Sequence, residues 1–288
     1  MGGIPPGIGE SSGGVKMGDR VPESRPGCAI TEAYTVYVAC STLCFAKHTL
    51  DSALRTIREM NFAKADVALH EDGPHLRPSD LTGDLTKIAQ KLKAANVAIA
   101  AFHARFAQHD GLETRKQFRG VCRLGRLLTV PVVSVQAAAK GGDFDADVAK
   151  LQDWVSIAAA EGVILTVETN SSTLTADPLA AVELCKRAPG LGLTLDPSHY
   201  MTGEHGPQDY DKLYPFVKHV RLRDSAAKPE SFQVRIGLGE LEYGKIVTNL
   251  DQFRYDRALT VDVRDMPESA FPVEPEVRKL KYLLESLV

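Results

Sequence analysis

Three carboxylates in this sequence lie inside or at the end of apolar runs, where acidic residues are uncommon. Glu168 ends the run VILTVE, Asp196 ends LGLTLD, and Asp262 lies within ALTVDV. An unpaired charge buried in such a run costs several kcal/mol, so a cation has to balance each carboxylate. A divalent metal held by carboxylates and a His is a common solution, and it polarises a sugar carbonyl or hydroxyl while a carboxylate moves a proton. We therefore expect Glu168, Asp196 and Asp262 in a metal or substrate site.

Histidine and arginine residues lie near these carboxylates in the predicted elements. His199 follows Asp196 in a loop, Arg221 lies in the run VKHVRL, and His103 ends VAIAAFH. Arg stays protonated and has no lone pair for a metal, but its guanidinium forms bidentate hydrogen bonds with carboxylates. The residues alone leave two arrangements open, in which either a metal ion or Arg221 balances the carboxylates. The acidic segment HEDGPH at 70–75 is a separate metal candidate.

Eight short apolar runs alternate with longer amphipathic stretches from Tyr34 onward. The runs are YTVYVA, ADVAL, VAIAAFH, VPVVSVQ, VILTVET, LGLTLD, VKHVRL and RALTVDV. Their seven intervals average about 31 residues, the length of a strand, a helix and two loops. This alternation predicts an α/β protein with a single (β/α)8 TIM barrel over residues 34–288. Functional groups of such a barrel gather at the carboxyl ends of the strands, where all three carboxylates are expected.

The segments between and before the strands carry their own signals. Asp177 is expected to cap a helix that begins at Pro178, and Asn61 and Asn96 are expected as left-handed C-caps. The longest connection runs from residue 223 to 240, and long loops at this face usually serve an active site or an interface. Residues 1–27 are rich in Gly, Pro and Ser without apolar periodicity, so we expect residues 1–33 to form a flexible lead-in.

The composition excludes several classes of protein. The chain has 288 residues with 34 Lys and Arg against 37 Asp and Glu, a net charge of −3. Such a balance disfavours a protein that binds nucleic acid mainly by charge. No uncharged stretch reaches the roughly 18 apolar residues of a membrane helix, so we expect no membrane partner. The odd number of Cys, 5, fits reduced thiols and a cytoplasmic location.

Four segments together resemble a known family, the xylose-isomerase-like barrels that include sugar phosphate isomerases and epimerases. They are LTVETN, LTLDPSHY, VKHVRLRDS and VRIGLGELEYGKIVTNLDQFRYDRALTVDV, and the resemblance covers residues 34–287. It implies a small-molecule carbohydrate substrate. It also implies a divalent ion (Mn, Mg, Co or Zn) whose ligands match Glu168, Asp196, a His on the seventh strand and a Glu on the eighth. The two Glu residues of that set exchange the substrate proton.

The sequence departs from the family pattern at two of these ligand positions. Arg221 takes the place of the seventh-strand His, Arg223 that of a nearby Lys, and Asp262 that of the terminal Glu. Arg221 therefore removes a metal ligand. His219 faces the same side of the strand about 6.6 Å deeper, which makes it a poor substitute. Asp262 is one methylene shorter than Glu, so it reaches less far toward a substrate atom.

The resemblance leads to a sugar or sugar-derivative isomerase or epimerase as the first expectation. Glu168 is its expected principal base and Asp262 its opposing acid/base. The expected substrate contacts are His103, His199, Arg221, Arg223 and Asp224. A metal-free descendant that binds a carbohydrate or a protein without turnover is the alternative, motivated by Arg221. Phosphodiester cleavage, as in the related apurinic endonucleases, is disfavoured because it needs many His ligands for three zinc ions. A homodimer is left open.

Overall fold

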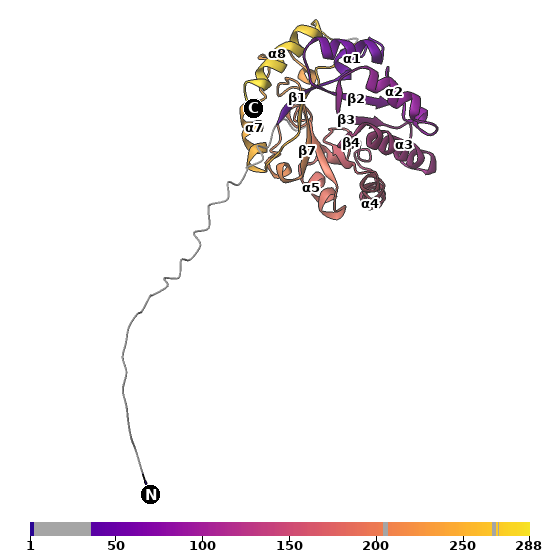
Figure 1. Cartoon of the computed structure of the whole chain (residues 1–288). Helices are drawn as coiled ribbons and strands as arrows, with labels where there is room; N and C mark the ends of the chain where they lie inside the picture. Colours follow the sequence, from indigo (N-terminus) through magenta and orange to yellow (C-terminus); the bar gives the residue numbers. More distant parts are fainter. Residues whose placement is uncertain (3–35, 204–206, 267–268, 270) are drawn as a thin grey trace, which may run out of the picture. The chain divides into compact units, whose positions relative to one another are not determined.

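Eight parallel strands close into a barrel in chain order (Figure 1). The computed structural model describes residues 1–2, 36–203, 207–266, 269 and 271–288. The strands are β1 (Tyr37–Ser41), β2 (Lys64–His70), β3 (Ala98–Arg105), β4 (Val132–Val135), β5 (Ile164–Glu168), β6 (Gly192–Leu195), β7 (Val217–Leu222) and β8 (Ala258–Val261). The predicted single (β/α)8 barrel is confirmed. Apart from Met1 and Gly2, the lead-in predicted for residues 1–33 lies outside the described residues.

Helices connect successive strands and surround the barrel (Figure 1). They are α1 (Leu50–Glu59), α2 (Thr86–Ala94), α3 (Leu112–Leu128), α4 (Phe144–Ala160), α5 (Pro178–Arg187), the short α6 (Ser198–Met201), α7 (Tyr243–Gln252) and α8 (Val273–Glu285). The predicted caps are confirmed, because Asp177 accepts a hydrogen bond from the Leu179 N–H and Asn61 and Asn96 have positive φ. No helix in the described part of the chain has the length and hydropathy to cross a membrane.

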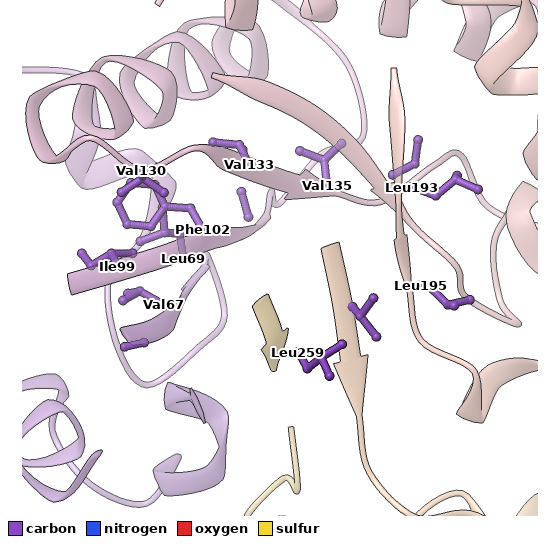
Figure 2. Packing of buried hydrophobic residues seen from close by; sticks show 14 of the residues in the cluster. Val67, Leu69, Ile99, Phe102, Val130, Val133, Val135, Leu193, Leu195 and Leu259 are labelled. Atoms are coloured by element: carbon purple, nitrogen blue, oxygen red, sulfur yellow. The ribbon is translucent and has the colours of Figure 1, made fainter. Parts of the chain in front are cut away.

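Side chains alternate along each strand between the helices and the barrel interior. The side chains toward the helices are mostly apolar and buried, and Figure 2 shows part of this layer, including Val67, Phe102, Val133, Leu195 and Leu259. The alternate positions hold a buried polar set that comprises Asp66, His103, Ser134, Thr166, Thr194, His219 and Thr260. Branched aliphatic side chains usually fill this space. Hydrogen bonds and ion pairs therefore carry much of the interior packing of this barrel.

The packing of α3 against the 3-10 turn Pro78–Leu81 depends on one glycine. A Cβ atom at Gly120 would lie 2.0 Å from the Leu81 carbonyl oxygen, so the two segments would have to separate. We expect Gly120→Ala to lower the free energy of unfolding by about 1–3 kcal/mol, as other overpacking substitutions do. The control is Gly83→Ala, where a Cβ meets nothing within 4 Å. Equal urea midpoints for the two variants would contradict the prediction.

Candidate active site

Arg221 on β7 binds two carboxylates from two other strands of the barrel. Its Nε and Nη2 atoms donate to the two oxygens of Asp66 at 2.9 and 3.1 Å, and its Nη1 donates to Glu168 Oε1 at 3.1 Å. His219 lies 2.8 Å from the same Asp66 carboxylate through Nε2. All four side chains are buried. The guanidinium thus joins β2, β5 and β7 in one ion-paired cluster.

Arg223, two residues later on the same side of the strand, binds the other two carboxylates. Its Nη1 lies 2.9 and 2.7 Å from the Asp196 oxygens, and its Nη2 donates to Asp262 Oδ2. Arg264 donates from Nε to the same Asp262 oxygen at 3.1 Å, and its Nη2 lies 3.8 Å from Glu168 Oε1. Its side chain is 23% exposed, whereas those of Arg221 and Arg223 are 0% exposed. Arg264 is therefore the guanidinium of this set that an incoming ligand meets first.

Two histidines extend the cluster from Glu168 toward β2. His103 Nε2 lies 3.4 Å from Glu168 Oε2, and His103 Nδ1 lies 3.2 Å from His70 Nε2. His103 Nε2 makes no hydrogen bond among the described residues, although Glu168 is its nearest carboxylate. The contact with His70 holds the two rings together beside Glu168.

His199 presents an unused donor next to Asp196. Its Nδ1 accepts from the Ser171 amide at 3.3 Å and lies 3.1 Å from the Ser171 hydroxyl, which places the ring proton on Nε2. This buried Nε2 has no hydrogen-bond partner among the described residues and lies 3.7 Å from Asp196 Oδ2. The Phe232 ring covers both His199, at 4.8 Å between ring centroids, and the Arg223 guanidinium, at 4.6 Å. The loop after β7 therefore closes over the mouth of the barrel.

Asp224 lies apart from the carboxylate cluster and holds that loop in place. Its Oδ2 accepts from the amides of Gly237 and Gly239 at 2.7 and 3.1 Å, and its Oδ1 from the Ser225 amide at 3.1 Å. Both oxygens are thus engaged within the loop. The substrate contact predicted for Asp224 stays a prediction, and the geometry gives this residue a positioning role for the loop that carries Phe232.

The ion pairs keep the buried carboxylates charged. Burial raises the pKa of Glu168, but His103, Arg221 and Arg264 outweigh it and hold that pKa well below its usual range. Burial likewise opposes ionisation of Asp262, and Arg264, Arg223 and Arg221 lower its pKa nonetheless. Arg221 and His219 have the same effect on the pKa of Asp66 despite its burial. A carboxylate with a lowered pKa is a weaker base, so Glu168 and Asp262 gain basicity only when these contacts loosen.

Three buried histidines make the protein sensitive to mild acid. Burial is the largest cause that lowers the pKa of His70, His103 and His199. The carboxylates beside His103 and His199 raise it in part but do not reverse the direction. The unfolded chain therefore binds more protons than the fold below about pH 6.5, and stability falls as the pH falls from there. Each neutral His adds up to about 1.4 kcal/mol per pH unit to this slope.

We expect His70→Gln to reduce the slope of unfolding free energy against pH between about 6.5 and 5. Urea titrations at half-unit pH steps measure it. His48→Gln, at an exposed position, is the matched control and should leave the slope unchanged. A wild-type stability that is flat across this range would contradict the neutral state of the three rings.

A divalent ion does not fit this donor set as it stands. An ion bonded to Glu168 Oε1 at about 2.1 Å would lie within about 5 Å of Arg221 Nη1. Charges of +2 and +1 at that separation repel by about 7 kcal/mol at an effective dielectric constant of about 20. Within the described residues, no group of three or more His, Cys, Asp or Glu is arranged to hold a metal. Guanidinium groups already bind Glu168 Oε1, both Asp196 oxygens and Asp262 Oδ2. Among the described contacts of these carboxylates, only Glu168 Oε2 and Asp262 Oδ1 are left without an arginine.

The structure brings most of the predicted site residues together. Glu168, Asp196, Asp262, Arg221 and Arg223 form one network, with His103 and His199 at its sides. Asp66 and Arg264 belong to the same network and were missed by the sequence prediction. His70, which was predicted only as part of the separate metal candidate at 70–75, belongs to it too. Asp66 lies in the apolar run ADVAL, so the signal that identified Glu168 was present there too. Arg264 follows Asp262 by two residues and therefore points to the same side.

Comparisons with known proteins agree with this architecture. Residues 54–285 match the model of the family described as xylose isomerase-like TIM barrel. No curated protein matches the sequence. Among solved structures, D-allulose 3-epimerase from Methylomonas sp. in complex with D-allulose has a TM-score of 0.68 at 14% identity, covering 88% of this chain and 98% of that one.

Two further solved structures are similar over the same share of this chain. A xylose isomerase domain protein from Planctomyces limnophilus has a TM-score of 0.66 at 19% identity, covering 88% of this chain and 97% of that one. A xylose isomerase-like TIM barrel protein from Mycobacterium smegmatis, in complex with magnesium, has a TM-score of 0.67 at 16% identity, covering 88% and 98%. These likenesses show the fold.

Proposed function

The chain belongs to the xylose isomerase-like TIM barrel family, and from that premise we propose that it acts on a sugar or sugar derivative as an isomerase or epimerase that uses arginine in place of a divalent ion. The observation that carries the proposal is the pairing of Arg221 with Asp66 and Glu168 and of Arg223 with Asp196 and Asp262. The charges that a metal balances in a carboxylate site are balanced here by the chain itself.

The groups at the mouth supply what proton transfer beside a carbonyl requires. The free Nε2–H of His199 is available to donate to a substrate oxygen, and the partly exposed Arg264 guanidinium can polarise a carbonyl. Glu168 would remove the proton from the adjacent carbon, and Asp262 would serve as the opposing acid/base. Because both carboxylates are buried, the loop with Phe232 and the Arg264 side chain have to move before the substrate reaches them.

Binding without turnover is the second candidate function. It is favoured by the full burial of Glu168 and Asp262 and by the lowering of both pKa values. In this form His199 and Arg264 hold the ligand, while the carboxylates only balance the arginines. The charged network then serves to shape the mouth.

Deuterium exchange separates these functions. The protein is treated with EDTA and incubated in D2O with a panel of aldoses and ketoses, and the sugar C–H signals are followed by NMR. The proposal predicts loss of a C–H signal beside the carbonyl of one sugar at a rate that added Mn²⁺ does not change. Saturation-transfer contacts without exchange would favour binding alone. Exchange that appears only after Mn²⁺ is added would contradict arginine in place of the ion.

A further inference from the structure

A small hollow lies beside the mouth, at the carboxyl ends of β3 and β4. Its volume is about 100 Å³, and its lining includes Arg105, Phe106, Gln108, His109, Gln136 and Trp154. That volume holds several water molecules, so the hollow has room for a carboxylate or phosphate group. The polar residues among those that line it are an Arg, a His and two Gln.

Arg105 gives the hollow a positive charge that the fold leaves uncompensated. It follows His103 by two residues on β3 and therefore points to the same side, nearer the mouth. Arg221, Arg223 and Arg264 each bind carboxylates, whereas among the described residues no carboxylate forms a salt bridge with Arg105. The charge of Arg105 acts on His70, whose pKa is lowered first by burial, then by His103 and then by Arg105.

The other wall of the hollow adds no negative charge. The nearby carboxylate, Asp147, is saturated, because it lies 2.7 Å from Lys150 Nζ and 2.8 Å from His109 Nε2 and accepts from the Ala138 amide at 2.8 Å. No Asp or Glu is among the residues that line the hollow. A guanidinium fork in such a setting favours a planar or tetrahedral oxyanion, which it binds through two parallel hydrogen bonds.

We propose that this hollow binds an anionic group of the ligand, with Arg105 as its principal contact and Gln136 as a further donor. The ligand is then an acidic or phosphorylated sugar whose anion lies at β3 and β4 while its carbonyl faces Arg264 and Glu168. The placement of the sugar rests on the proposed function. The anion site itself does not, since a free anion can be tested without turnover.

The first experiment measures the melting temperature in sodium phosphate and in sodium acetate, each against sodium chloride of equal ionic strength. Phosphate or acetate should raise the melting temperature of the wild type and of Arg123→Gln, an exposed arginine on α3 that serves as control. The shift should vanish in Arg105→Gln. The anion that gives the larger shift identifies the phosphate or the carboxylate class. No shift in the wild type, or an equal shift in Arg105→Gln, would overturn the proposal.

The second experiment compares acidic, phosphorylated and neutral sugars in the D2O exchange assay. Arg105→Gln should raise the half-saturating concentration of the charged sugar at least tenfold and leave that of a neutral sugar unchanged. If neutral sugars exchange their C–H hydrogen and the binding of no anion depends on Arg105, the proposed anion site is wrong and the proposed function stands. If phosphate stabilises through Arg105 and no sugar exchanges, the anion site stands and the proposed function fails.

Discussion

Replacing Arg221 by Met is expected to lower the free energy of unfolding by about 3–5 kcal/mol, the range found when one partner of a buried ion pair is removed. The Met side chain fills much of the arginine volume, so the loss reports charge rather than a cavity. Asp66 would keep only His219, and Glu168 would keep His103 and the more distant Arg264. Urea unfolding at pH 7.5 measures the effect.

The matched variants separate charge from packing. Arg123→Met removes an exposed arginine and should leave the unfolding free energy within about 0.5 kcal/mol of the wild type. Adding Asp66→Asn to Arg221→Met removes the carboxylate that has lost its partner, so the double variant should be more stable than Arg221→Met alone. If the second substitution brings no recovery, Arg221 and Asp66 are not an energetically coupled pair.

Glu168→Gln is expected to lower the rate of C–H exchange by about 10²–10⁴-fold, the usual contribution of a general base. The amide keeps the shape and still accepts a hydrogen bond from Arg221, so substrate affinity should change little. Glu183→Gln, an exposed carboxylate on α5, is the control and should exchange at the wild-type rate.

If Glu168→Gln loses C–H exchange only in proportion to its loss of folded protein, the result is no evidence that Glu168 is a base. Far-UV circular dichroism and the urea midpoint of the same preparation decide this. Unchanged exchange in a folded Glu168→Gln protein would contradict the role of Glu168. The reaction would then require another base.

The barrel and the members of its inner cluster were largely predictable because both follow from local patterns. Each strand is a short apolar run, and each carboxylate of the site interrupts such a run. Asp66 also interrupts an apolar run. It was not predicted as a site residue because none of the segments that resemble the family includes the second strand. Here the periodicity carried more information than the motif.

The pairing of charges was not predictable from spacing alone. Arg221 was expected to balance Glu168, and it does, yet two of its three guanidinium nitrogens bind Asp66, which is 155 residues away. Asp196 and Asp262 bind Arg223 instead. Which carboxylate an arginine reaches depends on how far the strands are staggered around the barrel, and this register is set by closure of the whole sheet.

The role of the loop after β7 was predictable only in outline. Its length indicated a function at the mouth. Two features of this loop depend on its folded path. Phe232 contacts Arg223 and His199. Backbone amides of the loop donate hydrogen bonds to the Asp224 carboxylate. Such a path is fixed by hydrogen bonds within the loop, for which the sequence has no periodic signal.

The central claim, that arginine takes the place of a metal ion, is tested most directly by metal analysis of the purified protein. Wild type and the Arg221→His/Arg223→Lys variant are incubated with Mn²⁺, desalted and analysed for bound metal, with melting temperatures recorded before and after. We predict substoichiometric metal and an unchanged melting temperature for the wild type. The variant should bind about one ion per chain and melt at a higher temperature with the ion than without it. Stoichiometric, stabilising metal in the wild type would contradict the claim.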